Sequence, residues 1–75
     1  MLNSKKIGKF LSDKRKENGF TQQQIAEKLN ISFQAVSKWE LGVTFPNIEL
    51  LTDIAKLFDI TVDELLLARR KAMFH

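Results

Sequence analysis

Apolar residues recur every three or four positions along most of this chain, in runs that are separated by short polar breaks. This spacing places the apolar side chains on one face of a helix, so each run predicts an amphipathic helix. We expect helices over about residues 4–18, 22–29, 33–41, 48–58 and 62–73. No segment alternates apolar and polar residues as a half-buried strand would, and the connections are short. The pattern therefore predicts an all-α domain, folded as a compact five-helix bundle.

The stretch from Thr21 to Gly42 carries the clearest signals for where helices start and stop. Thr21 precedes Gln24 by the spacing of an N-terminal capping box. Ser32 is the candidate N-cap of the following helix. Asn30, just before it, is one of the few non-glycine residues that tolerate a left-handed turn. These signals predict two short helices that meet at a tight corner.

The second helix of this pair has an apolar side and a free side. Val36 and Trp39 lie on its inward stripe, because they are separated by about one helical turn. The side chains that remain outward are those of Phe33, Gln34, Ser37 and Lys38. These four residues are therefore the candidate contacts to a partner molecule.

Arg15 and Glu40 lie near the ends of the first and third predicted helices. An arginine can bind a carboxylate through two parallel hydrogen bonds. We therefore expect Arg15 and Glu40 to form a structural ion pair that ties these helices together. A catalytic role for Glu40 is disfavoured, because the sequence offers it no base, metal or nucleophile as a partner.

Composition limits the kinds of site that the chain can hold. Its 75 residues include no cysteine and a single histidine at the last position, which excludes disulfides, thiolate chemistry and Cys- or His-based metal sites. Nucleophile–base pairs and glycine-rich phosphate loops are also lacking, so we expect no enzyme and no bound cofactor or metal. The net charge of +3 is compatible with a polyanionic partner.

The length of the chain suits one small domain, which we expect to span residues 1–75. No apolar run approaches the roughly 20 residues of a membrane-spanning helix. No signal-peptide pattern follows Met1. We therefore expect a cytoplasmic protein without a membrane partner.

Three blocks of sequence follow one another over roughly residues 5–67: GFTQQQIAEKLNIS, AVSKWELG and FPNIELLTDIAKLFDITVDELL. In order and spacing they resemble the Cro/C1-type (XRE) helix-turn-helix family of phage and bacterial repressors. The resemblance implies a lambda-repressor-like DNA-binding domain whose helix-turn-helix is formed by its second and third helices. It also implies a sequence-specific, double-stranded DNA-binding transcriptional regulator, with repression as the expected mode.

The resemblance assigns roles to individual residues. Those that would face base edges in the major groove are Phe33, Gln34, Ser37 and Lys38. Those that would contact DNA phosphates are Thr21, Gln22, Ser32 and Thr44. Arg15 and Glu40 match the interhelical ion pair of the family.

Phe33 and Leu41 depart from the family pattern. Phe33 stands where polar or basic residues are usual, and Leu41 lacks the polar group that some relatives direct at the DNA backbone. The Phe33 ring can touch a thymine methyl, or it can pack against its own domain or a partner protein. The two departures motivate an alternative function, a protein-interaction or antitoxin-type module on the same fold.

The end of the chain holds more apolar residues than one small core needs: Leu66, Leu67, Ala68, Ala72, Met73 and Phe74. Two-fold dimers that bind half-sites about 34 Å apart are the usual way for a small domain to read a longer site. We therefore expect a double-stranded DNA operator and a homodimer formed through residues 62–73 and the C-terminal tail. Alternatively, this end is frayed, or the chain is a piece of a longer repressor.

Overall fold

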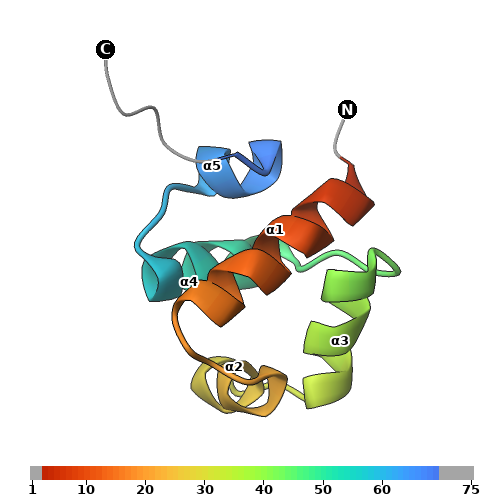
Figure 1. Ribbon diagram of the computed structural model, residues 1–75, viewed down its shortest axis with the longest axis vertical. Helices are drawn as coiled ribbons and strands as arrows, with labels where there is room; N and C mark the ends of the chain where they lie inside the picture. The colour runs from red at the N-terminus through yellow and green to blue at the C-terminus, as the bar shows by residue number, and fades with distance from the viewer. Residues whose placement is uncertain (1–2, 70–75) are drawn as a thin grey trace.

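The computed structural model describes residues 3–69 of the chain. It contains the helices α1 (Ser4–Glu17), α2 (Gln22–Leu29), α3 (Phe33–Leu41), α4 (Ile48–Phe58) and α5 (Val62–Leu67). No strand is present in this part of the chain. The prediction of an all-α, five-helix fold is therefore confirmed (Figure 1).

A polar side chain defines the start of each helix. The N-caps are Asn3, Thr21, Ser32, Asn47 and Thr61, each accepting a hydrogen bond from a backbone N–H of the first turn. At Thr21 the predicted capping box is complete: its hydroxyl accepts from Gln24 N at 3.0 Å, and its own N–H donates to Gln24 Oε1 at 2.8 Å. These bonds satisfy donors that a helix start leaves without partners, so α2 begins where the sequence predicts.

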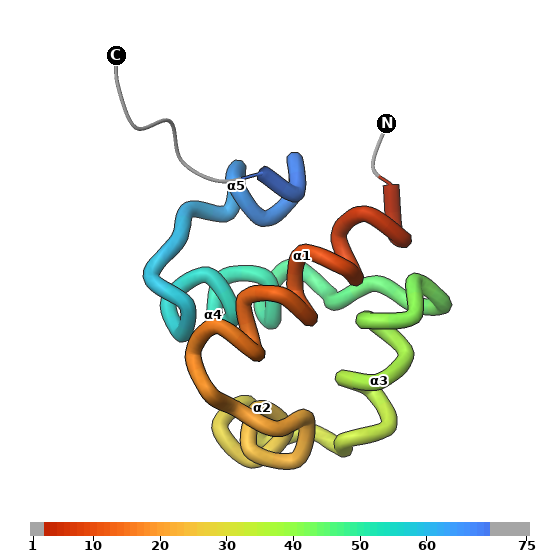
Figure 2. The backbone as a smooth tube through the Cα atoms, viewed as in Figure 1, coloured from red at the N-terminus to blue at the C-terminus, as the bar shows by residue number. Residues whose placement is uncertain are grey.

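Four of the helices end in the same left-handed turn. The residues that adopt it are Asn30 after α2, Gly42 after α3, Asp59 after α4 and Ala68 after α5, with φ angles of 58°, 78°, 56° and 52°. In each turn two backbone N–H groups bond back to carbonyls of the last helical turn, which is the Schellman arrangement. Asn30 thus makes the tight corner between α2 and α3 that Figure 2 traces.

The prediction of a fifth helix up to residue 73 is wrong, because the structure ends α5 at Leu67. Alanine favours helices, yet Ala68 adopts the left-handed conformation. The Schellman bonds offset the strain: Ala68 N donates to Leu65 O and Arg69 N donates to Glu64 O, both at 3.1 Å. Residues 70–73 of the predicted helix lie outside the described residues. The first helix ends at Glu17, one residue earlier than predicted.

The core draws apolar side chains from all five helices. Its members are Ile7, Phe10, Leu11, Ile25, Ala26, Val36, Trp39, Leu51, Ile54, Phe58 and Leu65. α1 crosses the middle of the molecule and packs against α3 and α5, while α2 packs against α3 (Figure 1). α3 consequently lies at one edge of the fold with one side turned outward. None of the described helices has the length and apolar character needed to cross a membrane.

Gly8 allows α1 to lie directly on the end of α3. A Cβ atom at this position would lie 2.8 Å from the carbonyl oxygen of Glu40 and closer still to that of Trp39. Only glycine fits against these two backbone atoms. The contact fixes the position of the C-terminal half of α3, the helix that carries most of the candidate site.

Candidate nucleic-acid interface

The outward side of α3 carries the four side chains that the sequence singled out. Val36 and Trp39 are buried and hold the opposite side of the helix in the core. Gln34 and Lys38 are exposed and Ser37 is half-buried. Phe33 is 44% exposed, so its ring is only partly covered by its own domain. The structure therefore brings a phenyl ring, an amide, a hydroxyl and an ammonium group onto one short helix, away from its buried stripe.

The helix starts beside this surface carry the residues proposed to meet phosphates. The Thr21 and Ser32 hydroxyls accept backbone hydrogen bonds of 3.0 and 3.3 Å at the starts of α2 and α3, and both residues are exposed. Because a hydroxyl also carries one proton, each can still donate to an anion. Thr44 is exposed in the loop after α3. Helix N-termini also offer free backbone N–H groups and a positive dipole end, which favour phosphate.

Gln22 differs from the other phosphate candidates, because its amide already has a partner within the protein. It is half-buried as the first residue of α2, and its Nε2 donates to Glu40 Oε1 at 3.0 Å. This bond could not be predicted from the sequence, since the two residues are far apart in the chain and meet only through the packing of α2 against α3.

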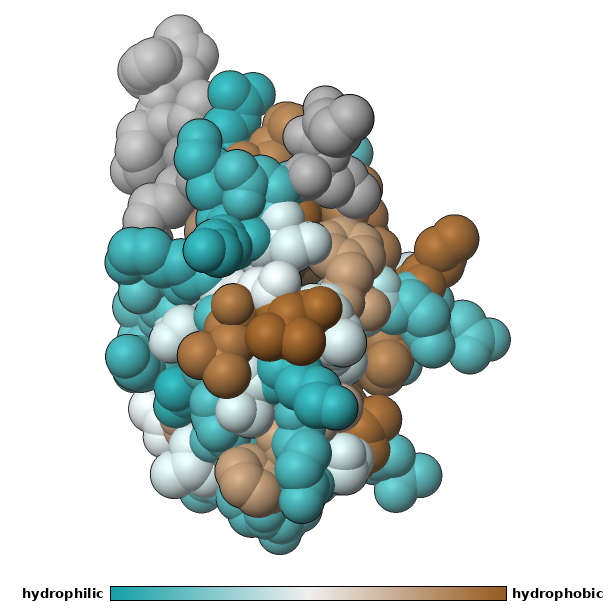
Figure 3. Space-filling model, turned by 90° about the vertical axis from the view of Figure 1, so that its right-hand side faces the viewer, coloured by the Kyte–Doolittle hydropathy of each residue, from teal (hydrophilic) through white to brown (hydrophobic). Residues whose placement is uncertain are grey.

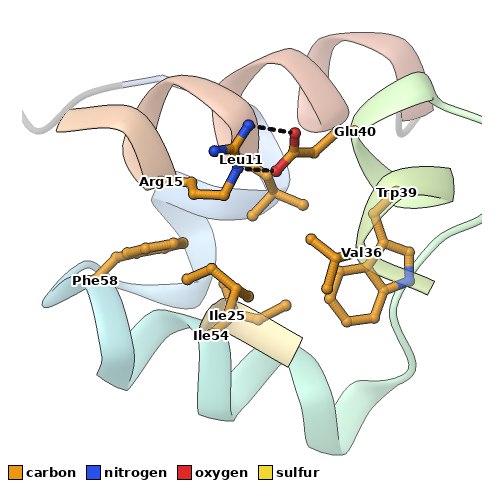
Figure 4. Close-up of a pocket in the computed structure, with 8 residues that line it drawn as sticks. All are labelled: Leu11, Arg15, Ile25, Val36, Trp39, Glu40, Ile54 and Phe58. Carbon is orange, nitrogen blue, oxygen red and sulfur yellow. Dashed lines mark hydrogen bonds and ion pairs between the residues drawn. The ribbon is translucent and has the colours of Figure 1, made fainter. Parts of the chain in front are cut away.

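Arg15 and Glu40 form a two-pronged ion pair between α1 and α3 (Figure 4). Arg15 Nε donates to Glu40 Oε2 at 2.7 Å, and Nη2 donates to Oε1 at 3.0 Å. Arg15 Nη1 donates to the carbonyl oxygen of Phe20 at 2.9 Å. The two side chains are only 14% and 9% exposed. The pKa of Arg15 is raised, first by its hydrogen bonds to Glu40 and also by the charge of that carboxylate, against the lowering effect of burial.

A small cavity lies beneath this ion pair. Its lining, drawn in Figure 4, consists of Leu11, Arg15, Ile25, Val36, Trp39, Glu40, Ile54 and Phe58. The volume of about 10 Å³ is near the minimum for a single water molecule. It is too small for a cofactor. Among residues 3–69, no three His, Cys, Asp or Glu side chains gather into a possible metal site.

Two lysines near α3 form no ion pair with any described residue. Lys38 is exposed on α3 itself. Lys5 lies beside the end of α3, since its Cγ would be 2.9 Å from a Cβ placed on Gly42. By contrast, Lys9 pairs with Asp13 at 3.2 Å. The ammonium groups of Lys38 and Lys5 are thus available to a polyanion.

Apolar side chains are exposed on the same side of the molecule. Leu41 at the end of α3 is 68% exposed and Val43 in the following loop is 67% exposed. Figure 3 views the molecule from the α3 side and shows brown apolar surface in the middle of that face, with white and teal surface around it. The sequence marked Leu41 as a departure, whereas the exposure of Val43 was not predicted.

Known proteins resemble the chain in sequence over the helix-turn-helix and the helices around it. A family model described as Helix-turn-helix matches residues 11–65. The HTH-type transcriptional activator BcrR of Enterococcus faecalis is 48% identical over 56 residues, which make up 75% of this chain and 28% of BcrR. The cryptic phage CTXphi transcriptional repressor RstR of Vibrio cholerae is 38% identical over 60 residues, 80% of this chain and 54% of RstR. The chain thus spans only part of the length of these relatives.

Solved structures share the fold. The clp gene regulator ClgR from Corynebacterium glutamicum is similar with a TM-score of 0.79 and 25% sequence identity. The similarity covers 91% of this chain and 72% of the ClgR chain. The arrangement of helices described above is therefore one that other regulators use.

Proposed function

Because the chain belongs to the helix-turn-helix family of Cro/C1-type regulators, we propose that it is a sequence-specific, double-stranded DNA-binding domain that regulates transcription. α3 is the recognition helix and enters the major groove. The observation that carries the proposal is the two-sided character of α3, with Val36 and Trp39 buried behind it and its polar groups exposed in front. An α-helix fits the major groove, where each base pair presents a distinct pattern of donors and acceptors.

Each side chain on the exposed side of α3 contacts a different kind of group on the base edges. Gln34 presents its amide to adenine N6 and N7, and Lys38 donates to guanine O6 or N7. Ser37 donates to or accepts from a base edge, and its small size lets the helix sit deep in the groove. Phe33 meets a thymine methyl, because an apolar ring cannot hydrogen-bond to a base.

The phosphate contacts fix the helix in register without reading sequence. Thr21, Gln22 and Ser32 lie at the starts of α2 and α3, where backbone N–H groups and the helix dipoles favour an anion. Thr44 lies in the loop that follows α3. The unpaired ammonium groups of Lys38 and Lys5 support the assignment of a polyanionic partner.

The active form in this proposal is a cytoplasmic homodimer on a two-fold operator. Its interface forms through α5, where Leu67 is 57% exposed and Leu66 is half-buried, and through the C-terminal tail, which lies outside the described residues. Dimerisation places two recognition helices about one DNA turn apart, roughly 34 Å. Among the relatives, BcrR is a transcriptional activator and RstR a transcriptional repressor, and for this chain we propose repression.

A second candidate function rests on the exposed apolar side chains near α3. Phe33, Leu41 and Val43 are all substantially exposed, and exposed apolar surface on a small domain can mark a protein-binding site. A protein-interaction or antitoxin-type module on the same fold would use them to bind a protein partner.

Selection of bound DNA from a random pool, followed by sequencing, separates the two functions. We expect an enriched site with two related half-sites. On that site, Gln34→Ala and Lys38→Ala should each lower specific affinity by about 1–3 kcal/mol and relax specificity at one position. Lys56→Ala, which removes an exposed lysine of α4, is the matched control and should change little. A pool without any enriched sequence would contradict the proposal and favour the protein-interaction module.

A further inference from the structure

The Glu40 carboxylate links three helices through a single oxygen atom. Glu40 Oε1 accepts hydrogen bonds from Arg15 Nη2 on α1 and from Gln22 Nε2 on α2, both at 3.0 Å. Glu40 itself belongs to α3. A carboxylate can only accept hydrogen bonds, so the NH₂ group of Gln22 and not its carbonyl must face it. The contact therefore fixes which end of the Gln22 amide points into the protein.

We infer that Glu40 is a positioning residue for DNA binding, because it holds the Gln22 amide ready to donate to a phosphate. The inference rests on the proposed function. An NH₂ group has two hydrogens, and Glu40 uses one of them. Gln22 is the first residue of α2, and a helix start carries backbone N–H groups without helical partners. A phosphate at this helix start would meet both kinds of donor.

Positioning matters here because a glutamine side chain is flexible. Binding a phosphate with a free glutamine costs the entropy of several rotatable bonds. A side chain that is already held in its bound geometry loses less entropy on binding, and the affinity rises accordingly. Gln22 is held in this way, whereas the neighbouring Gln23 is exposed and bonds only to Glu27 at 3.3 Å along its own helix.

Arg15 makes the carboxylate compatible with a nearby phosphate. An unpaired Glu40 would repel the anion that Gln22 is meant to bind. The two hydrogen bonds from the Arg15 guanidinium neutralise that charge while leaving Oε1 able to accept from Gln22. The ion pair thus serves as a neutral acceptor for the amide as well as a tie between α1 and α3.

The test uses the 75-residue chain and a DNA site obtained from the random-pool selection. Glu40→Met alone would leave the largely buried Arg15 without its partner and can unfold a small domain. The double variant Arg15→Met/Glu40→Met replaces both charges with apolar side chains of similar size, an exchange that proteins often tolerate. Circular dichroism and thermal unfolding first establish that this variant folds. Affinities are then measured by fluorescence anisotropy with and without Gln22→Ala.

Loss of a hydrogen bond to a charged group corresponds to about a ten- to hundredfold loss of affinity. We expect Gln22→Ala to have such an effect in the native chain and less than about a threefold effect in the Arg15→Met/Glu40→Met background. Gln23→Ala is the matched control and should have a small effect in both backgrounds. An equal loss from Gln22→Ala in the two backgrounds would overturn the inference while leaving the proposed function intact.

Nitrogen-15 relaxation of the side-chain amides tests the positioning without any DNA. In the native chain the Gln22 NH₂ group should be rigid and the Gln23 NH₂ group mobile, and in the Arg15→Met/Glu40→Met variant both should be mobile. A Gln22 amide as mobile as that of Gln23 in the native chain overturns the inference even if the chain binds its DNA site. Failure of the native chain to select any DNA overturns the proposed function, and the inference with it.

Discussion

Replacing Gly8 with alanine probes the contact that holds α3, the proposed recognition helix, against α1. Alanine is normally the better residue inside a helix, and the exchange usually raises stability by about 1 kcal/mol. Position 8 should behave in the opposite way, because its neighbours are the backbone carbonyl oxygens of Trp39 and Glu40 on α3. A backbone atom cannot rotate aside as the end of a flexible side chain can. The two helices would have to move apart.

The size of the effect follows from the contact distances. The added Cβ would lie 2.8 Å from Glu40 O, whereas ordinary contacts of this kind begin near 3.4 Å. An extra carbon forced into a packed site costs about 1–3 kcal/mol, and the rigid backbone neighbours place this site at the upper end. After the gain in helix propensity of about 1 kcal/mol, the net loss is about 2 kcal/mol. For a domain of this size, Tm should fall by roughly 8–16 °C.

Thermal unfolding followed by circular dichroism measures this loss directly. Ser12→Ala in the same helix is the control, because it removes an atom and adds none, and it should leave Tm unchanged or slightly higher. DNA affinity measured well below Tm should also fall for Gly8→Ala, since α1 would displace the end of α3 that carries Lys38. A Gly8→Ala variant as stable as the native chain would refute the argument, because α1 and α3 would then not be in close contact.

Three further predictions concern the reading surface, the corner and the dimer. If Phe33 contacts a thymine methyl, uracil in place of that thymine should lower the DNA affinity of the native chain about three- to fivefold and leave the affinity of Phe33→Ala unchanged. Equal losses of affinity for the native chain and the variant, measured by titration, would contradict the contact. Asn30→Ala should lower the free energy of unfolding by about 1 kcal/mol, because the corner is left-handed, while Asn30→Gly should not; urea denaturation measures both, and equal stabilities would rule the explanation out. Leu67→Glu should convert a dimer into a monomer in analytical ultracentrifugation, and an unchanged sedimentation coefficient would argue against an interface through α5.

Features that depend on neighbours in sequence were predictable. A cap joins residues three apart, so Thr21 and Gln24 could be paired from spacing alone, and the capping box is present. The resemblance to the Cro/C1-type family rested on similar local blocks and is confirmed by the family match over residues 11–65. The end of α5 was predicted wrongly, because the prediction of a helix end also depends on a local signal and none is present there. Ala68 carries no local stop signal, and the left-handed turn at this position is visible only in the backbone.

Features of the site that depend on how helices pack were only partly predictable. The ion pair of Arg15 and Glu40 followed from two opposite charges near helix ends, and the structure brings them together. The bond from Gln22 to the same carboxylate did not follow, because its existence depends on how α2 lies against α3. The close approach of α1 and α3 at Gly8 could not be predicted either, since a glycine within a helix does not by itself indicate that another backbone lies against it. Assignment of bases to the side chains of α3 stays a prediction.

The proposed interface relies on geometry more than on charge, and this explains why so many of its parts are rigid. The residues proposed to contact phosphates (Thr21, Gln22, Ser32 and Thr44) are all uncharged, and the chain carries a net charge of only +3. Uncharged contacts release few counterions, so they add little to the non-specific attraction that basic proteins have for DNA. Hydrogen bonds of this kind are strong only when donors are held in place. The donors are held in place by the capped start of α2, by the bond between Gln22 and Glu40, and by the contact of α3 with Gly8. Weak non-specific binding in turn raises the ratio of specific to non-specific affinity, which sets the discrimination between sequences.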